Sequence, residues 1–309
     1  IAKVLQQKYR VRYQEGNYNV PLTLSFVLTG QQLPTLTNPF GWFMAWVHGQ
    51  KYIYGNFPYD VVLLELGTDA PGDIIAFKDI VKADIAVVSA ISEEHMEYFH
   101  NLEAVAEEEL SVAHFAQKLI INKDDCNTDF IDLFVPNNIP VINYGFTKRA
   151  HYAIQAKRNT HHSFDMMVTT PSKSAIHSHV SVAAEYGLKA VAAAIAVADV
   201  LQLTHKQIEK GVAAITPNAG RMRIFEGLNN TIIIDDSYNS SPLAAEAALH
   251  SLYGMQAPER IAILGSMNEL GVVSQTAHEK IGSMCVPDKL SLVITIDDQA
   301  NSFIAKQAE

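Results

Sequence analysis

The chain has 309 residues, of which 48% are hydrophobic and 18% are charged, and this composition is typical of a globular protein with a full hydrophobic core. Its formal charge of -10 argues against a general nucleic-acid or anionic-membrane surface, although local basic pockets could still bind phosphates. Cys126 and Cys285 have no metal-ligand spacing and cannot form a disulfide framework. No apolar run reaches the ~20 residues needed to cross a bilayer. We therefore expect a cytoplasmic protein without a membrane span.

Short apolar runs alternate with longer helical patterns along the chain, which predicts βαβ units and a mostly parallel sheet. The candidate strands are 61–65, 85–89, 119–122, 232–235, 260–264 and 290–296, and the clearest helices are 102–117, 188–201 and one that begins at Thr204. A proline- and glycine-containing connection at 215–220 predicts a domain boundary. We expect an α/β central domain over 1–218 and a partial Rossmann-like domain over 219–309.

The segment 31–59 carries both tryptophans and many other aromatic residues. A hydrophobic helix packed on the sheet is the favoured interpretation, and a membrane-proximal or partner-docking patch is the alternative.

The segment 143–182 is rich in His, Ser and Thr and has alternating polarity, which predicts a β-hairpin excursion. His161, His162, His177 and His179 lie within it. Because no carboxylate or cysteine stands at a useful spacing, structural or solvated histidines are favoured over a metal site.

The run TIIIDDSYNSSP at 231–242 predicts a short buried strand followed by a turn and a helix that begins with proline. This places Asp235, Asp236, Tyr238 and Asn239 at the carboxyl end of a strand, where α/β proteins bind ligands. Taken alone, the same run could also be a solvated turn with an Asp cap.

Further motifs accompany this run in a fixed order. They are GNYNVPLTL at 16–24, LELG at 64–67, PGDI at 71–74, SEEHMEYF at 92–99, IINKDD at 120–125, GRM at 220–222 and LGSMNELG at 264–271. Together they resemble the Mur ligases, the ATP-dependent amide-forming enzymes of peptidoglycan synthesis, over nearly the whole chain. The likeness is greatest to the branch that adds D-alanyl-D-alanine.

The resemblance implies ATP and Mg²⁺ as cofactors, and UDP-muramoyl tripeptide and D-alanyl-D-alanine as substrates joined through an acyl-phosphate. It implies a role in cell-wall biogenesis, and so in cell shape and division. The family's phosphate loop, G-x-x-x-x-G-K-[ST], does not occur in this chain. We expect that loop and the N-terminal domain upstream of Ile1, and a shortened C-terminal end, so that the fragment itself is inactive. The third residue of the peptide and the oligomeric state cannot be predicted.

The resemblance also assigns a magnesium and catalytic site. Glu65 and His95 match the family residues that face the metal and the reacting phosphate. Glu109 stands where most members carry a carbamylated lysine that binds magnesium, and a carboxylate could supply the same charge. The alternative for Glu109 is a solvated acidic helix face shared with Glu107 and Glu108.

On the nucleotide side, Arg221 matches the arginine that reaches an ATP phosphate from the hinge between domains. Asp236 matches a carboxylate on the ribose side. Tyr238, Asn239 and Asn122 would approach the base.

Two departures from the family pattern keep other functions open. Tyr186-Gly187 stands where members have His-Asn or His-Gln, and Ser266 replaces an Asp. These changes would suit a non-catalytic scaffold. Another branch, similar to folylpolyglutamate synthetase or to a lipid-linked muramoyl ligase, is a further alternative, although DDSYNSSP and GSMNELG favour the D-alanyl-D-alanine branch.

Overall fold

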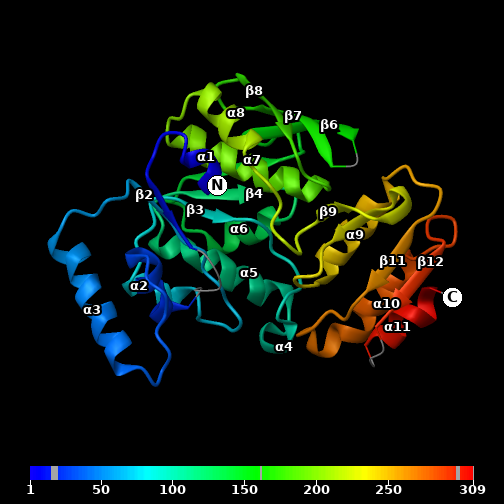
Figure 1. The fold of residues 1–309 in the computed structure, drawn as a ribbon, viewed down its shortest axis with the longest axis horizontal. Coiled ribbons are helices and arrows are strands. Elements are labelled where there is room, and N and C mark those ends of the chain that lie inside the picture. Colours follow the sequence, from blue (N-terminus) through cyan, green and yellow to red (C-terminus); the bar gives the residue numbers. More distant parts are fainter. Residues whose placement is uncertain (15–19, 161, 297–299, 309) are drawn as a thin grey trace.

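The computed structural model describes residues 1–14, 20–160, 162–296 and 300–308. An N-terminal body is built around a six-stranded sheet, and a smaller C-terminal unit begins at β9 and lies beside it (Figure 1). Part of the 16–24 motif, together with His161, falls outside the described residues.

The elements follow the predicted alternation. The helices of the body are α1 Ala2–Leu5, α2 Pro21–Thr29, α3 Pro39–Tyr54, α4 Met96–Phe99, α5 Leu102–Leu110, α6 Thr128–Phe134, α7 Glu185–Val200 and α8 His205–Ala213. Its strands are β1 Val11–Tyr13, β2 Val61–Leu63, β3 Ala86–Val88, β4 Leu119–Asn122, β5 Val141–Gly145, β6 Tyr152–Thr160, β7 Ser163–Thr169 and β8 Ala175–Val180. The C-terminal unit comprises β9 Arg223–Glu226, β10 Ile232–Asp235, α9 Pro242–Tyr253, β11 Ile261–Leu264, α10 Ser274–Met284, β12 Leu292–Thr295 and α11 Asn301–Ala308.

The main sheet has the order β3-β4-β5-β6-β7-β8. Strands β3 to β6 pair in parallel, and β6, β7 and β8 form the antiparallel excursion predicted for 143–182. Strands β1 and β2 make a separate parallel pair, and β2 shares no ladder with β3. Both nevertheless pack against one core, through side chains such as Val61 on β2 and Val87 on β3. The predicted α/β class with a mostly parallel sheet is confirmed.

Helix α7 is the centre of that core. Its consecutive residues Ala192–Ala198 are all buried. Small alanine side chains let neighbouring elements approach from every side, which explains why a helix that is apolar all round can lie inside a domain. Local signals set the other helix starts as expected, since Asn101 Oδ1 accepts from Ala104 N at 2.8 Å and Thr204 forms a capping box with Gln207.

Helix α3 departs from the expectation of a helix packed on the sheet. It begins at Pro39 behind the cap Asn38, stands away from the sheet, and has no buried residue (Figure 1). Its inner side meets α2 through an edge-to-face contact between Trp42 and Phe26, with ring centroids 5.7 Å apart. The packing prediction was wrong because large apolar side chains, namely Phe40, Phe43, Trp46, Ile53 and Tyr54, remain exposed on α3.

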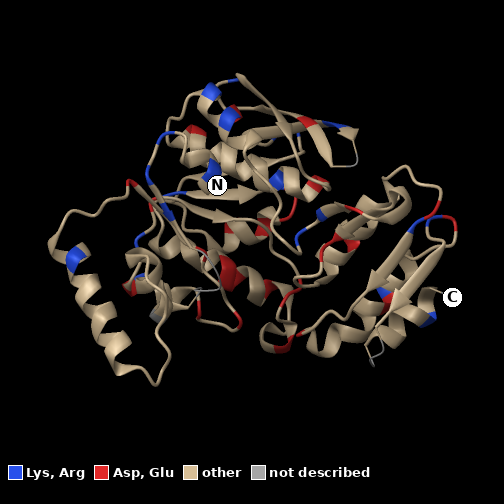
Figure 2. Ribbon diagram, viewed as in Figure 1, with Lys and Arg blue, Asp and Glu red and all other residues tan. Residues whose placement is uncertain are grey.

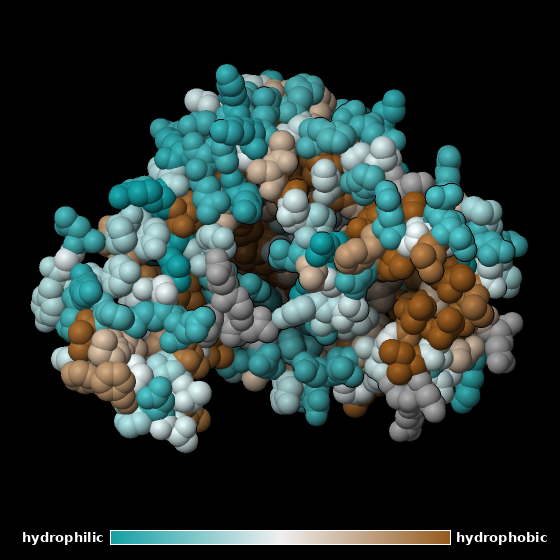
Figure 3. Space-filling model, in the orientation of Figure 1, coloured by the Kyte–Doolittle hydropathy of each residue, from teal (hydrophilic) through white to brown (hydrophobic). Residues whose placement is uncertain are grey.

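The C-terminal unit has two small sheets, an antiparallel β9–β10 pair and a parallel β11–β12 pair. Helices α9, α10 and α11 contribute Leu249, Ile281 and Ile304 to its core. The outward side chains of the parallel pair stay exposed, and Figure 3 shows them as a hydrophobic patch on the right. They are Ile261, Ile263, Leu292 and Ile294, and Ile296, directly after β12, is exposed as well.

Candidate functional site

Gly220 lies between the body and the C-terminal unit, at a tight crossing of its backbone with that of Tyr238. Its φ is +69°, and a Cβ at this position would lie 3.0 Å from the backbone nitrogen of Tyr238. That nitrogen donates to the Gly220 carbonyl at 3.2 Å, while the Gly220 N–H donates to Asp235 Oδ2 at 3.2 Å. Only glycine accommodates both the left-handed backbone and this approach. The GRM and DDSYN motifs are therefore held against each other.

Three predicted nucleotide residues gather at this crossing. The guanidinium carbon of Arg221 lies 4.3 Å from the ring centroid of Tyr238, and both residues are exposed. Asp236 Oδ1 accepts hydrogen bonds from Met222 N at 3.0 Å and from the Tyr186 hydroxyl at 3.3 Å. We call Arg221, Asp236, Tyr238 and Tyr186 the hinge cluster. Asn239 follows directly in the chain and is also exposed.

The two adjacent carboxylates of this turn have different surroundings. Hydrogen bonds from the hydroxyl and N–H of Ser237 lower the pKa of Asp235. Burial raises the pKa of Asp236, while the Met222 N–H, the Tyr186 hydroxyl and the Arg221 charge act against that rise. Asp235 therefore stabilises the turn as an anion that accepts from Ser237 and Gly220. Asp236 is the carboxylate that contacts Tyr186 of the body.

Tyr186 was identified from the sequence only as a departure from the family pattern. In the structure it lies at the start of α7 and bonds across the boundary to Asp236, and burial raises the pKa of its hydroxyl. Ala183, Ala184 and Met222 form a small core beside it. The next residue, Gly187, fits because a Cβ there would lie 2.9 Å from Val182 Cβ. The departure thus has a structural role as a contact between the two parts of the chain.

Ser266, the other departure, also has a structural contact. Asn301, buried in α11, donates from its amide nitrogen to Ser266 Oγ at 3.2 Å and to the Ile296 carbonyl at 2.9 Å. Ser266 therefore helps to fix the first turn of α11 against the end of β11.

The second predicted site lies in the body, around His95. His95 caps α4, and its Nε2 lies 3.9 Å from Asp69 Oδ1. Burial raises the pKa of Glu109 to about 7, with further contributions from Glu94 and Glu108 and an opposing one from His95. Figure 2 shows acidic residues on α4 and α5 in this part of the molecule. The structure thus brings His95 and Glu109 into one electrostatic environment.

Glu65 does not complete a metal site with these two residues. It is exposed beyond the end of β2, and its backbone N–H donates to Gln14 Oε1 at 3.3 Å. Within the described ranges, no three His, Cys, Asp or Glu side chains converge in a way that could hold a metal ion. The ladders do not support the expected adjacency of the two strand ends, since β2 pairs with β1 and β3 pairs with β4. The three-ligand site of Glu65, His95 and Glu109 is therefore not assembled in this structure.

Glu108 is not on a solvated face, contrary to the alternative offered for this helix. It is buried, and its carboxylate accepts from Gly72 N at 2.7 Å, Ile74 N at 2.6 Å and Thr68 Oγ1 at 3.2 Å. Those bonds hold the loop that carries Asp69 toward His95. For Glu109, the sequence itself argued against a solvated position, since Glu109 falls on the same helical face as the apolar side chains of α5.

Asn122 is buried at the end of β4. Its amide nitrogen donates to the Ser89 carbonyl at 2.9 Å and to Asp125 Oδ2 at 2.6 Å, and its Oδ1 accepts from Asp124 N at 3.1 Å. Asp125 also pairs with Lys189 of α7 at 2.7 Å. Because both amide N–H groups serve the protein, a contact between Asn122 and a base stays a prediction.

A cleft of about 500 Å³ opens beside these strand ends. The body lines it with Ile91, Ser92, Lys123, Asp124, Asp125, Asn127 and Thr128, and α9 contributes Leu243. The cleft therefore lies at the junction of the two parts of the chain, at the carboxyl end of parallel strands.

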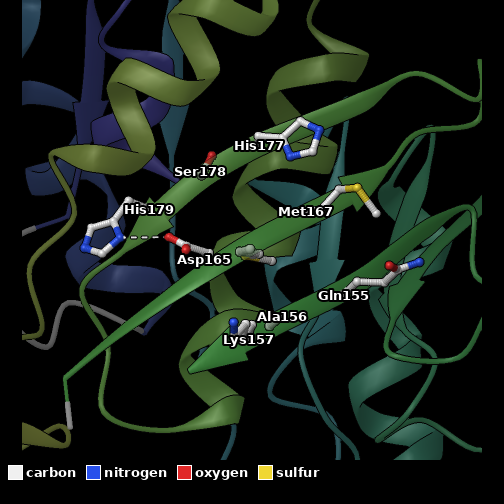
Figure 4. A pocket seen from close by; sticks show the side chains of 9 residues that line it. Gln155, Ala156, Lys157, Asp165, Met167, His177, Ser178 and His179 are labelled. Atoms are coloured by element: carbon white, nitrogen blue, oxygen red, sulfur yellow. Dashed lines mark hydrogen bonds and ion pairs between the residues drawn. The ribbon is translucent and has the colours of Figure 1, made fainter. Parts of the chain in front are cut away.

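The histidine-rich excursion forms a separate, shallow surface, which Figure 4 shows at close range. His177 and His179 are exposed on β8, and His179 Nδ1 lies 3.1 Å from Asp165 Oδ1 on β7. The sequence spacing did not reveal this carboxylate because the antiparallel register sets the two residues opposite each other. These histidines are solvated side chains of a sheet face.

Comparisons with known proteins agree with this architecture. Residues 56–198 match the family described as the Mur ligase middle domain, and residues 220–309 match the one described as the Mur ligase glutamate ligase domain. The chain belongs to the Mur ligase family. Helix α3 lies outside both matched segments.

Similar sequences include two named UDP-N-acetylmuramoyl-tripeptide–D-alanyl-D-alanine ligase. The Bacillus subtilis protein is 23% identical over 100% of this chain and 61% of its own length. The Rickettsia prowazekii protein is 27% identical over 72% of this chain and 50% of its own length. The chain thus spans between half and two thirds of the length of these relatives.

Solved structures share the fold. The MurF of Acinetobacter baumannii superposes with a TM-score of 0.81 at 17% identity and covers 99% of this chain and 61% of its own. The MurF of Thermotoga maritima, solved in complex with ADP, superposes with a TM-score of 0.77 at 20% identity. The match covers 98% of this chain and 64% of the Thermotoga chain. No helix in the described part of the chain has both the length and the apolar character that a membrane crossing requires.

Proposed function

We propose that this chain is the ATP-dependent part of a cytoplasmic ligase that joins D-alanyl-D-alanine to a UDP-muramoyl tripeptide. The relatives named for this reaction support the substrate assignment. The single observation that carries the proposal is the hinge cluster, in which Arg221, Asp236 and Tyr238 meet where the two matched segments join. We also propose the division into domains 1–218 and 219–309.

In the proposed reaction, a carboxylate oxygen of the muramoyl peptide attacks the γ-phosphorus of ATP and ADP leaves. The amine of D-alanyl-D-alanine then attacks the acyl carbon, phosphate leaves, and the nitrogen loses a proton. Arg221 is exposed at the boundary and can orient phosphate oxygens through its planar donors. Asp236 stands one residue beyond β10 to accept from the ribose, and closure of the two domains excludes water from the acyl-phosphate.

Magnesium fits this site only in part. A bound Mg²⁺ would offset charge on the phosphates, and such ions take one or two carboxylates together with the substrate phosphates. Glu109 suits that role, because a carboxyl group with its pKa raised to about 7 among other acidic groups is stabilised as an anion by a nearby cation. His95 lies in the same environment. Glu65 stays a prediction.

The proposal is tested on the product of the complete reading frame that encodes this chain. We expect release of ADP only when UDP-muramoyl tripeptide and D-alanyl-D-alanine are both present, with formation of the amide measured by chromatography. Failure to consume ATP with any peptide acceptor would refute the ligase and favour the scaffold alternative.

The same assay separates the other branch of the superfamily. A folate substrate with glutamate should give no ADP. Consumption of ATP with that pair, and not with D-alanyl-D-alanine, would move the chain to the folylpolyglutamate branch. A folylpolyglutamate synthetase of Lactobacillus casei superposes with a lower TM-score of 0.60, so the fold alone does not decide between them.

A further inference from the structure

We propose that Glu269 of the C-terminal unit is a positioning residue for His95 of the body. Its carboxylate fixes the orientation of the His95 ring, so that the His95 site is complete only when the C-terminal unit is docked. The catalytic meaning of this contact rests on the proposed ligase function. The contact itself is a property of this chain and can be tested without catalysis.

Three contacts join these segments. The His95 Nδ1 atom forms an ion pair with Glu269 Oε2. The backbone nitrogen of Glu97 donates to the Glu269 carbonyl at 3.1 Å. Gly271 packs so closely on α4 that a Cβ there would lie 3.0 Å from the Glu97 Cα. Side chain, main chain and a glycine approach therefore hold one loop of the C-terminal unit on α4.

The backbone on both sides of the contact is in the left-handed region. His95 has a φ of 52° and Glu269 a φ of 62°, and neither residue is glycine. Such conformations cost free energy and persist where the surroundings impose them, which is common at functional sites. Two residues in this conformation that face each other across a boundary point to a contact with a function.

The contact also decides which ring nitrogen carries the proton. His95 Nδ1 is shielded from solvent and forms no hydrogen bond with the described residues, and the Glu269 carboxylate is the charged group in ion-pair contact with it. A carboxylate at Nδ1 favours an N–H at that atom and leaves Nε2 with its lone pair. Nε2 is the nitrogen turned toward Asp69, at 3.9 Å. Glu269 thus leaves Nε2 of His95 as the nitrogen that faces the loop carrying Asp69.

The first test measures the ring directly in residues 1–309. Long-range proton–nitrogen NMR spectra of ¹⁵N-histidine-labelled protein, with the signal assigned through His95→Gln, should show His95 protonated at Nδ1. Glu269→Ala should convert it to the Nε2-protonated form or a mixture. Glu269→Gln should retain the wild-type tautomer, because the amide oxygen can still accept. Glu259→Ala, at an exposed glutamate of the same unit, is the matched control.

An unchanged His95 tautomer in Glu269→Ala would overturn the proposal. Hydrogen exchange gives an independent readout. The Glu97 amide should exchange faster in Glu269→Ala than in the Glu259→Ala control, since the ion pair no longer holds the loop on α4. Equal exchange in both variants would also contradict the role of Glu269 as the residue that secures this contact.

The second test uses the complete enzyme. Loss of an orienting partner of this kind typically lowers activity 10- to 100-fold, so Glu269→Ala should reduce kcat by that factor with little change in the KM for D-alanyl-D-alanine. Glu269→Gln should retain much of the wild-type kcat. A normal kcat in Glu269→Ala with the tautomer changed would refute the positioning role. An inactive wild type would refute the ligase function and leave the NMR result standing.

Discussion

The hinge cluster and the His95 site differ in how far apart in the chain their parts lie. In the hinge cluster, Gly220-Arg221 and Asp236–Tyr238 are joined by the β9–β10 hairpin, whose register sets Asp235 opposite Arg223. The His95 site draws on α4, α5, the loop before residue 74 and a loop of the C-terminal unit. The hairpin brings Arg221, Asp236 and Tyr238 of the first site together, and only Tyr186 joins them from α7. The second site depends throughout on how distant segments are packed.

The largest expected effect is at Arg221 of the hinge cluster. Arg221→Ala in the complete enzyme should lower kcat by about 100-fold or more, because one donor to developing charge is typically worth that much. Thermal unfolding should change little, since Arg221 is exposed. Arg223→Ala is the control, because Arg223 is also exposed and stacks on Phe225 outside the cluster. Near-normal turnover of Arg221→Ala would remove the phosphate assignment.

The next effect concerns Glu109 beside the His95 site. Its pKa is raised from 4.5 to about 7 in the folded chain, so the folded state binds the proton more tightly than the unfolded state. The stability of the fold should therefore fall as pH rises from about 4.5 to about 7 and then level off. The loss is on the order of 3 kcal/mol.

Glu109→Gln should remove this dependence. Urea unfolding in the presence of EDTA at several pH values should show the variant to be more stable than wild type at pH 8 and similar at pH 4. Glu107→Gln, at the exposed neighbour, should follow the wild-type curve. A Glu109→Gln curve parallel to wild type would mean that Glu109 is solvated.

Glu108 tests whether the loop beside His95 depends on α5. Glu108→Ala leaves the Gly72 and Ile74 N–H groups without their carboxylate acceptor and should cost about 2–3 kcal/mol of unfolding free energy. Urea denaturation measures this loss, with Glu107→Ala as the exposed control. Equal stabilities of the two variants would show that the buried hydrogen bonds of Glu108 do not hold the loop.

The smallest effect is expected at Tyr186. Tyr186→Phe removes one hydrogen bond to Asp236 and should lower the free energy of unfolding by about 1 kcal/mol, as a single bond of this kind does. Tyr54→Phe, at an exposed tyrosine of α3, provides the baseline. If both variants lose the same free energy of unfolding, Tyr186 does not link α7 to the C-terminal unit.

The sequence predicted most of the fold because its signals are local. Strand runs, Asn101 and Thr204 as caps, and the alternating polarity of 143–182 each depend on near neighbours. Helix α3 was misplaced because hydrophobicity alone does not say whether a helix finds a partner. The strand 61–65 was predicted two residues too long, and no ladder joins it to β3.

The site residues differ in the same way in how far the sequence could predict them. Arg221, Asp236 and Tyr238 were predicted as nucleotide residues from the family resemblance. The β9–β10 hairpin, which brings them together, was not predicted, because strand 223–226 was missed. Glu108 and Glu269 could not be predicted, since their partners lie 34 residues or more away or across the boundary. Tyr186 carried a signal only as a departure from a pattern, and its contact with Asp236 becomes visible only when α7 is packed beside β10.

The central claim is that the hinge cluster binds the nucleotide of an ATP-dependent ligase. A crystal structure of the complete protein with ADP tests it most directly. We expect an Arg221 donor within hydrogen-bond distance of the nucleotide's phosphates and Asp236 within the same distance of its ribose. A nucleotide bound elsewhere, with Arg221 still stacked on Tyr238 and Asp236 bonded only to Met222 and Tyr186, would contradict it.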